Sequence, residues 1–301
     1  MPNNQLSKPQ KILFVINPIS GDIDKNYLQE KIEVLAAKKQ FAFEIQFTKG
    51  KNDQRLITEA IRKFAPGKVV AVGGDGTCNL VAKILMNRNI LMGIIPLGSA
   101  NGLAKELQIP QNLDEAMKTI IADKSKAIDL VIINQKHVSL HLADIGINAQ
   151  VVKRFERDHI RGFAGYAKHF IQELFAARPL KFKVTLDGRK IIKKAYMVVI
   201  ANATKYGTGA IINPKGSISD GKFEIILIRP YSVWHLFQMV IPFFTRKIHE
   251  LDYIKSYSGQ KATIHNYGKK ELQIDGEVIG RLKEINVEIN PHALEILVSE
   301  Y

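Results

Sequence analysis

The chain has 301 residues, which is enough for one large or two ordinary domains. It is 46% hydrophobic and 24% charged, which is typical of a well-cored protein rather than a disordered one. No apolar run approaches the roughly 20 residues of a membrane-spanning helix, and the polar residues 1–11 lack the apolar stretch of a secretion signal. The single cysteine, Cys78, excludes an internal disulfide. Together these features predict a cytoplasmic protein.

The net charge of +14 is unevenly distributed. Residues 151–194 hold twelve Lys or Arg against four Asp or Glu. Such a segment fits a solvated basic face, an anionic lipid surface or nucleic acid. Its aromatic residues, including Phe155 and Tyr166, have spacings that suit a helix core as well as base stacking. We therefore expect a solvated face or a peripheral membrane contact, and no nucleic-acid partner.

The first 110 residues alternate between apolar, β-branched runs and segments with helical spacing. This alternation predicts a doubly wound parallel sheet. The expected strands are 11–16, 41–47, 68–73 and 90–95, and the expected helices are 25–38, 53–64, 79–86 and 103–107.

Three of these strands end in loops rich in Gly, Ser or Asn, namely Asn17–Gly21, Gly73–Thr77 and Gly98–Gly102. Parallel sheets bind ligands outside the carboxyl ends of their strands. Glycine lets the backbone approach an anion, and a helix N-terminus presents free N–H groups to it. The loops therefore predict a phosphate or nucleotide site, in which the Asp75 carboxylate is placed to hold Mg²⁺.

The pattern changes after about residue 130, where short alternating strands predict an antiparallel sandwich or barrel. We therefore divide the chain into domains 1–130 and 131–301. Helix 233–244 either packs on the sheet or lies in a lipid interface. The expected helices are 113–121, 151–177 and 233–244, and the expected strands are 127–133, 136–142, 181–186, 190–200, 222–228, 260–265, 271–274, 284–289 and 294–298.

Two Asp-Gly turns in the second half have alternative interpretations. Asp220-Gly221 is most simply a turn, but an aspartate with nearby backbone carbonyls also suits a divalent cation. Asp275-Gly276-Glu277 is most simply a hairpin turn between two short strands. It also offers two carboxylates, one of which is able to take a proton from a hydroxyl.

Taken in order, these motifs resemble the diacylglycerol kinase catalytic-domain family, the bacterial lipid kinases related to sphingosine and ceramide kinases. The Gly73–Thr77 motif also occurs in NAD kinases, but the ordered set is more specific. The resemblance covers about residues 11–298 and rests on Asn17–Gly21, Gly73–Asn79, Pro96–Ala104, Arg161-Gly162 with Tyr166, Asp220-Gly221 and Asp275–Glu277.

The resemblance implies an NAD-kinase-like α/β domain and a β-sandwich domain, with ATP bound in a cleft between them. It implies that Glu277 is the general base with Asp275 beside it, and that Asp75 orients Mg²⁺. It also implies a metal held by Asp220 with backbone oxygens of Ser217 and Lys222. The residues implied around ATP are Asn17, Ser20, Gly21, Thr48, Gly73, Gly74, Asp75, Gly76, Thr77, Asn79, Ser99 and Asn101.

The chain departs from the family pattern at Leu80, Gly102 and Asn148, where acidic residues are common. The acceptor therefore stays open among diacylglycerol, phosphatidylglycerol and sphingoid lipids. The hypothesis from sequence is an ATP- and Mg²⁺-dependent lipid kinase at the inner membrane surface, with a homodimer as one possible assembly. The alternatives are an NAD kinase and a nucleotide-binding regulator without turnover.

Overall fold

The computed structural model describes residues 10–21, 24–122, 124–146, 178–205, 211–229, 235 and 247–299. The expected helix 151–177, nearly all of the expected helix 233–244, and Asn148 lie outside these residues. The chain forms two compact units. The first runs to Lys126 and includes the chain from Leu294 onward, and the second is Ala127–Ala293. The expected boundary at 130 differs from this division chiefly because the C-terminal segment returns to the first unit.

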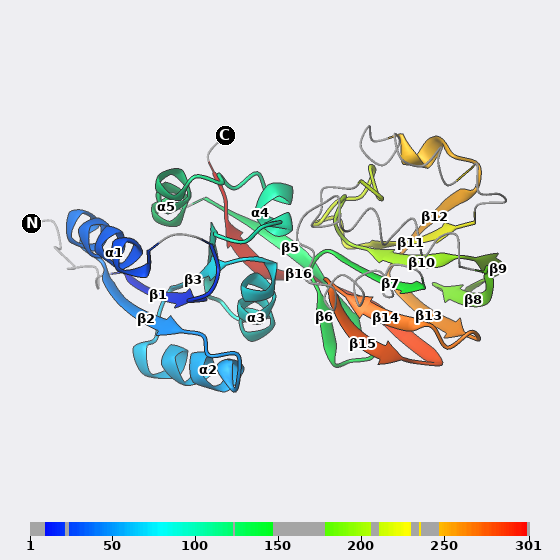
Figure 1. Cartoon of the computed structure of the whole chain (residues 1–301), viewed down its shortest axis with the longest axis horizontal. Helices are drawn as coiled ribbons and strands as arrows, with labels where there is room; N and C mark the ends of the chain where they lie inside the picture. Colours follow the sequence, from blue (N-terminus) through cyan, green and yellow to red (C-terminus); the bar gives the residue numbers. More distant parts are fainter. Residues whose placement is uncertain are drawn as a thin grey trace, which may run out of the picture. The chain divides into compact units, whose positions relative to one another are not determined.

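The first unit is built on parallel strands in the order β2-β1-β3-β4, followed by the end of β16 (Figure 1). The pairing is parallel because each of the first four strands is followed by a helix. This helix brings the chain back to the end of the sheet at which the previous strand began. The strands are β1 (Lys11–Ile16), β2 (Ala42–Phe47), β3 (Lys68–Gly73), β4 (Leu91–Pro96) and β16 (Glu284–Leu297).

Helices cover both faces of this sheet, as the alternating apolar sequence predicts (Figure 1). Helices α1 and α5 share one core with β1, β3 and β4, while α2 and α3 contact β1 and β3 and each other. None of the helices in the described ranges is long and apolar enough to cross a membrane. The helices are α1 (Lys25–Lys39), α2 (Asp53–Phe64), α3 (Asp75–Leu85), α4 (Gly102–Glu106) and α5 (Leu113–Ile121).

The second unit contains two sheets. One of them continues the sheet that holds β1 to β4, and its strands in the second unit follow the order β16-β13-β8-β9. Strand β5 also pairs with β16, and β6 pairs with β5. The other sheet has the order β12-β11-β10-β7-β14-β15. Their bounds are β5 (Ser125–Ile133), β6 (His137–Ser139), β7 (Leu142–Gly146), β8 (Leu180–Leu186), β9 (Arg189–Ala195), β10 (Met197–Ala201), β11 (Phe223–Ile228), β12 (Ile254–Gly259), β13 (Lys261–Asn266), β14 (Glu271–Ile274) and β15 (Glu277–Arg281), with the short helix η1 (Ile248–Glu250).

Inward side chains of the two sheets form one buried core, which makes this unit a β-sandwich. Phe182 and Val184 from β8 meet residues such as Ile145 and Phe223 of the other sheet in this core. Outward residues of β8 and β13 alternate with these buried ones. The expected fold class, a parallel α/β sheet followed by an antiparallel sandwich, is confirmed.

Two expected strands were wrong in their extent. The segment 190–200 is two strands in different sheets, because the chain changes sheets at Tyr196. The segment 136–142 is not one strand, because β6 ends at Ser139 and β7 begins at Leu142. Strand β12 was not expected, since its Ser-rich outer face lacks apolar alternation.

The two strands expected at 284–289 and 294–298 form one long strand, β16. The strand runs through Asn290-Pro291, and the chain passes through His292 in a left-handed conformation, with φ of 50°. The His292 N–H donates to Asp129 Oδ1 at 2.8 Å. A buried carboxylate therefore replaces a neighbouring strand as the hydrogen-bond partner at this irregular position.

Candidate functional site

The three glycine-containing loops meet at the carboxyl ends of the strands of the first unit's sheet. β1 lies between β2 and β3, so the chain order of the strands reverses at β1. In open parallel sheets this reversal is where ligands bind, outside the carboxyl ends of the strands. The loops Asn17–Gly21, Gly73–Thr77 and Gly98–Gly102 follow β1, β3 and β4 at this edge.

The loops touch through backbone atoms. A methyl group on Gly98 would lie 2.5 Å from the Gly74 Cα, so no side chain fits between these two loops. Gly21 has a φ of 68°, and a methyl group there would lie 2.9 Å from the Leu97 carbonyl oxygen. Glycine is therefore required at these positions by the close approach of one loop's backbone to another, whereas the sequence predicted close approach to an anion.

The first loop is held by its own polar groups. Asn17 Oδ1 accepts from the Ile19 N–H at 3.1 Å, and Ser20 Oγ donates to the Asn17 carbonyl at 3.0 Å. Lys25 Nζ donates to the Ser20 carbonyl at 2.6 Å. These bonds place Ser20 Oγ next to Gly73, 3.1 Å from where a Cβ would be. Asn17 and Ser20 are thus brought to the glycine loop.

Asp75 joins the second and third loops. Its Oδ2 accepts from the Gly102 N–H at 3.0 Å, and its Oδ1 accepts from the Leu103 N–H at 3.2 Å. Both donors lie in the first turn of α4, where N–H groups lack helical partners. The carboxylate therefore caps a neighbouring helix, and each oxygen keeps one further lone pair.

The N-terminus of α3 is open. Gly74 provides no side-chain cap, and the N–H groups of Asp75 and Gly76 have no acceptor among the described residues. Gly76 is exposed, and apart from its chain neighbours and the backbone of its own helix no atom lies within 4 Å of the position that its Cβ would take. Helix α3 was expected to begin near Asn79, but it begins at Asp75, so the glycine loop forms its first turn. Free N–H groups beside open space suit an anion.

The remaining expected ligand residues differ in exposure. Ser99 is exposed and Thr48 is half-buried, with its N–H donating to the Ile16 carbonyl. Asn101 Oδ1 accepts from the Gly98 N–H at 2.8 Å, so its side chain shapes the third loop. Asn79 and Thr77 are buried in α3, and Asn79 Oδ1 has no partner within the part of the chain that the structure describes.

In the second unit, Asp275 and Glu277 have different environments. Asp275 and Gly276 both have positive φ, 47° and 93°, in a two-residue hairpin turn between β14 and β15. The Asp275 side chain is 1% exposed. Its carboxylate accepts from the N–H groups of residues 140, 141 and 142 at 2.7–3.0 Å and from Ser139 Oγ at 3.0 Å. Four donors make Asp275 an anchor of the turn.

Glu277 is exposed, and its carboxylate has no hydrogen bond or ion pair with another described residue. The turn that presents it is held by hydrogen bonds of the Gln273 side chain. Gln273 Oε1 accepts from the Gly276 N–H at 2.7 Å, and Gln273 Nε2 donates to Asp144 Oδ2 at 2.5 Å. Asp144 lies opposite Gln273 on β7 and is fully buried. Of the two carboxylates, only Glu277 is open to a reacting hydroxyl.

The Asp220 loop contains one exposed carboxylate. Asp220 Oδ1 accepts from the Lys222 N–H at 3.1 Å, and Ser217 Oγ accepts from the Ser219 N–H at 3.4 Å. The Gly221 N–H donates to Asp129 Oδ2 at 2.6 Å. In the described ranges, no group of three or more His, Cys, Asp or Glu side chains is arranged to hold a metal ion. A metal here would depend on Asp220 and backbone oxygens.

Asp129 and Asp144 are buried carboxylates that were not among the residues expected to be functional. Each interrupts an apolar strand, and a charged residue in such a run was the available signal. Asp129 is fully buried and accepts from the N–H groups of Gly221 and His292. It therefore fastens the Asp220 loop and the irregular turn of β16 to strand β5.

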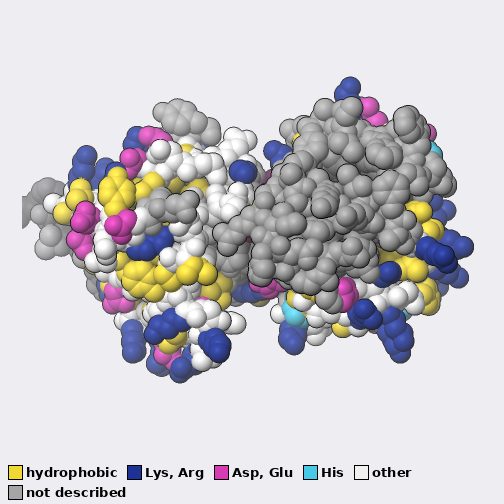
Figure 2. Space-filling view, in the orientation of Figure 1, with side chains coloured by type: hydrophobic (Ala, Val, Ile, Leu, Met, Phe, Trp, Pro, Cys, Tyr) yellow, Lys and Arg dark blue, Asp and Glu magenta, His cyan; other side chains and the backbone are white. Residues whose placement is uncertain are grey.

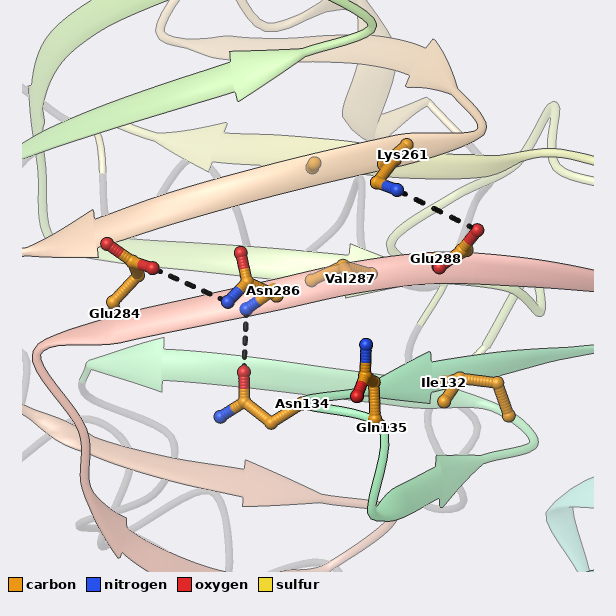
Figure 3. Close-up of a pocket in the computed structure, with 9 residues that line it drawn as sticks. Ile132, Asn134, Gln135, Lys261, Glu284, Asn286, Val287 and Glu288 are labelled. Atoms are coloured by element: carbon orange, nitrogen blue, oxygen red, sulfur yellow. Dashed lines mark hydrogen bonds and ion pairs between the residues drawn. The ribbon is translucent and has the colours of Figure 1, made fainter.

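A groove of about 560 Å³ lies on the outer face of β13 and β16, beside the Asn134-Gln135 turn (Figure 3). Its polar groups satisfy each other: the Asn286 N–H donates to Asn134 Oδ1 at 2.7 Å, and Lys261 pairs with Glu288 at 4.0 Å. No buried polar atom of these residues lacks a partner. We therefore place no functional site there.

Comparison with known proteins finds a family match for each half of the chain. Residues 11–133 match the diacylglycerol kinase catalytic domain, and residues 142–298 match the YegS C-terminal NAD kinase beta sandwich-like domain. The chain belongs to this diacylglycerol kinase-like family. The resemblance drawn from the motifs is confirmed, and family membership makes the chain a nucleotide-using phosphotransferase with an alcohol acceptor.

Two curated relatives of this diacylglycerol kinase-like protein are 28% identical to it. Lipid kinase YegS of Escherichia coli (strain K12) aligns over 71% of this chain and 72% of its own length. The uncharacterized protein sll0036 of Synechocystis sp. aligns over 97% of this chain and 71% of its own. A crystal structure of a diacylglycerol kinase from Bacillus anthracis matches 98% of both chains with a TM-score of 0.75 at 21% identity, which supports the fold.

Proposed function

We propose that this protein is an ATP- and Mg²⁺-dependent kinase that transfers the γ-phosphate of ATP to a hydroxyl of a lipid. The observation that carries the proposal is the N-terminus of α3, whose first backbone N–H groups have no acceptor among the described residues. The three loops lie around it in backbone contact, at the point where the order of the strands reverses. Phosphoryl transfer asks a protein mainly for positioning and for stabilisation of phosphate oxygens, which backbone N–H groups supply.

The nucleotide phosphates would lie against Gly74 and Gly76, with Asn17, Ser20 and Ser99 around them. These residues lie on the three loops, and Gly76 leaves the backbone accessible. Thr48, at the end of β2, and Asn79, in α3, would contribute from the margins of the site.

The residues present fit Mg²⁺. This ion usually keeps several waters and is held by one or two carboxylates together with substrate phosphates. Asp75 is the only carboxylate within the three loops, and each of its oxygens retains a lone pair beside its backbone donor. Asp75 would hold the ion, which supplies charge neutralisation at the transferred phosphate. A second ion would be held by Asp220 with the backbone oxygens of Ser217 and Lys222.

Glu277 would act as general base. Its exposed carboxylate is the one in the Asp-Gly-Glu turn that is not occupied by backbone donors. It would accept the proton of the lipid hydroxyl while that oxygen attacks the γ-phosphorus, the bond from this phosphorus to the bridging oxygen breaks, and ADP leaves. Asp275 would keep the turn in its left-handed conformation. The relative named a lipid kinase supports a lipid acceptor, and the basic composition supports action from the cytoplasm at an anionic membrane surface.

Replacing Gly76 by Ala tests the nucleotide site. The added methyl group meets no atom within 4 Å, so the free energy of unfolding should stay equal or rise by up to about 1 kcal/mol in this helical position. The same methyl group should obstruct a phosphate and weaken ATP binding at least about tenfold. Isothermal titration with ATP and Mg²⁺ measures this. Unchanged affinity in the folded variant would place the nucleotide elsewhere.

Transfer of labelled γ-phosphate to lipids in mixed micelles tests the reaction. The protein should label a diacylglycerol, phosphatidylglycerol or sphingoid acceptor, and Glu277→Gln should lower kcat by about 10² to 10⁴ with little change in ATP affinity. Label on NAD would instead identify an NAD kinase. ATP binding without label on any of these acceptors would favour a regulator. Full activity in Glu277→Gln would remove that residue as base.

A further inference from the structure

The outer side of the β8–β9 hairpin carries a row of lysines. In β8, Phe182, Val184 and Leu186 point into the sandwich core, so the alternating residues Lys181 and Lys183 point outward. Among the strands that the structure describes, β9 is the last of this sheet, so the hairpin lies at its end. Figure 2 shows Lys and Arg side chains gathered beside apolar ones where Figure 1 places β8 and β9.

Strand β9 continues the same face. The register places Lys194 opposite Lys181, Ile192 opposite Lys183, and Lys190 opposite Thr185. Residues opposite each other in an antiparallel pair lie on the same face of the sheet. We call the surface formed by Lys181, Lys183, Lys190, Ile192, Lys194 and the nearby Tyr267 the lysine face.

Two large apolar side chains are exposed on the lysine face. Ile192 is 52% exposed and Tyr267 is 59% exposed. Lys181 Nζ lies 5.9 Å from the centre of the Tyr267 ring, which ties the aromatic ring to the row of lysines. The face thus combines cations with one aliphatic and one aromatic side chain.

No acidic side chain within β8 or β9 offsets these charges. Asp187, in the turn between them, is directed toward the backbone N–H groups of Gln260 and Lys261 at 2.9–3.2 Å. Glu284 pairs with His265 at 3.3 Å. Like charges that lie opposite each other, such as Lys181 and Lys194, lower the stability of a hairpin. An anionic partner that binds this face would relieve the repulsion between them.

We infer that the lysine face is the surface by which this protein docks on an anionic lipid bilayer. Lysines near such a surface are attracted by its negative potential. Tyr and Ile side chains enter the headgroup region, while Lys stems extend along apolar surface with the charge in water. The choice of a bilayer as partner rests on the proposed lipid kinase function, but docking is measurable without turnover.

The chemistry of the face favours a membrane over nucleic acid. All four cations at its outward positions are lysines, which act as point charges on a diffuse anionic surface. Nucleic-acid phosphates are recognised preferentially by the planar fork of arginine. An exposed isoleucine between the lysines also adds nothing to a phosphate contact, whereas it gains energy by entering lipid.

Vesicle sedimentation tests the inference with the full chain. Vesicles of phosphatidylcholine with about 30% phosphatidylglycerol supply a strongly negative surface. Replacing Lys181, Lys183, Lys190 and Lys194 together by Gln should lower the partition coefficient about 100-fold at low ionic strength. The control replaces four exposed lysines of the first unit by Gln, namely Lys38, Lys39, Lys51 and Lys63. It removes the same charge and should lower partitioning less than about threefold.

A second variant separates the apolar contribution. Ile192→Thr keeps a β-branched residue in the strand and should lower partitioning about fivefold at every salt concentration, because apolar transfer is not screened. Circular dichroism and thermal unfolding verify that each variant is folded. An equal loss in the two lysine variants would show that net charge alone drives binding, and this would overturn the inference.

Other outcomes also decide the question. Binding of the intact protein to anionic vesicles that is unchanged by the lysine-face variant would overturn the inference, as would no binding at all. Preferential capture of single-stranded RNA, lost in the same variant, would assign the face to nucleic acid instead. Turnover of a short-chain lipid without vesicles should be the same in the lysine-face variant and the intact protein. If the intact protein turns over no lipid, the proposed function fails while vesicle binding still reports on the face.

Discussion

Asp275 and Glu277 are two residues apart but have separate tasks. Asp275 is enclosed by three backbone N–H donors and the Ser139 hydroxyl, whereas Glu277 is exposed. Asparagine at 275 would point an N–H₂ group at one of these donors and lose the negative charge. A buried donor left unpaired costs about 1–3 kcal/mol, and a lost charge adds to this.

We therefore expect Asp275→Asn to lower the free energy of unfolding by about 2–4 kcal/mol. Glu277→Gln should leave this free energy within about 0.5 kcal/mol of the starting value, because the residue is exposed. Urea unfolding of both variants measures the difference. Similar stabilities in the two variants would contradict the assignment of Asp275 as an anchor.

Cys78 provides a test of the packing behind the glycine loop. The thiol is buried in α3, and burial, with a smaller contribution from nearby Asp75, raises the pKa of Cys78 well above its usual range. The thiolate is the reactive form, so the folded protein should be protected. At pH 8 an aromatic disulfide reagent should react at least about 100-fold more slowly than in denaturant. Fast labelling of the native protein would show that α3 opens readily.

At the scale of elements, the hairpin β14–β15 is positioned by β7. Gln273 spans the distance between the buried Asp144 and the Gly276 N–H, so one amide joins the strand to the turn. Gln273→Met keeps the length of the side chain but removes both hydrogen bonds. The turn would lose an acceptor, and Asp144 would lose a donor in a buried environment.

We expect Gln273→Met to lower the free energy of unfolding by about 1–3 kcal/mol and to lower kcat more than it raises the KM for ATP. Asp144→Asn keeps an oxygen for Gln273 Nε2 and should retain more activity. Steady-state kinetics with the lipid acceptor separates these effects. A kcat of Gln273→Met equal to that of the intact protein would show that the two Gln273 hydrogen bonds do not position Glu277.

At the scale of the whole molecule, β16 contributes to both units. Its first residues pair with β13 in the second unit, and Ile296 pairs with Met92 in the first. Leu294, Ile296, Leu297 and Val298 are all buried. The order of the sequence therefore does not separate the chain into two independent halves, because the first unit is complete only when the C-terminal strand has joined it.

A chain that ends at Ala293 should lose the fold of the first unit. Four buried aliphatic side chains contribute about 6–12 kcal/mol, which is comparable with the total stability of a domain. A chain that ends at Ser299 is the matched control. Thermal unfolding and ATP titration should show loss of the transition and of binding only in the shorter chain. Retained ATP affinity in that chain would contradict the requirement for the strand.

The sequence by itself determined the local elements and the loops of this protein. Apolar periodicity located the helices and strands of the first unit to within a few residues, except the start of α3, because each lies on one sheet with a regular buried face. Glycine at Gly21, Gly74 and Gly98 was informative because only glycine permits the backbone contacts observed there. The ordered motifs then led to the family.

Tertiary structure decided what local pattern does not contain. The change of sheet at Tyr196 and the continuity of β16 through His292 depend on partners far away in the chain, since the N–H groups of Tyr196 and His292 donate to the Ile228 carbonyl and the Asp129 carboxylate. The different roles of Asp275 and Glu277 likewise follow from which neighbours surround each carboxylate. Local preference acts over a few residues, whereas burial and hydrogen bonding are settled only when distant segments meet.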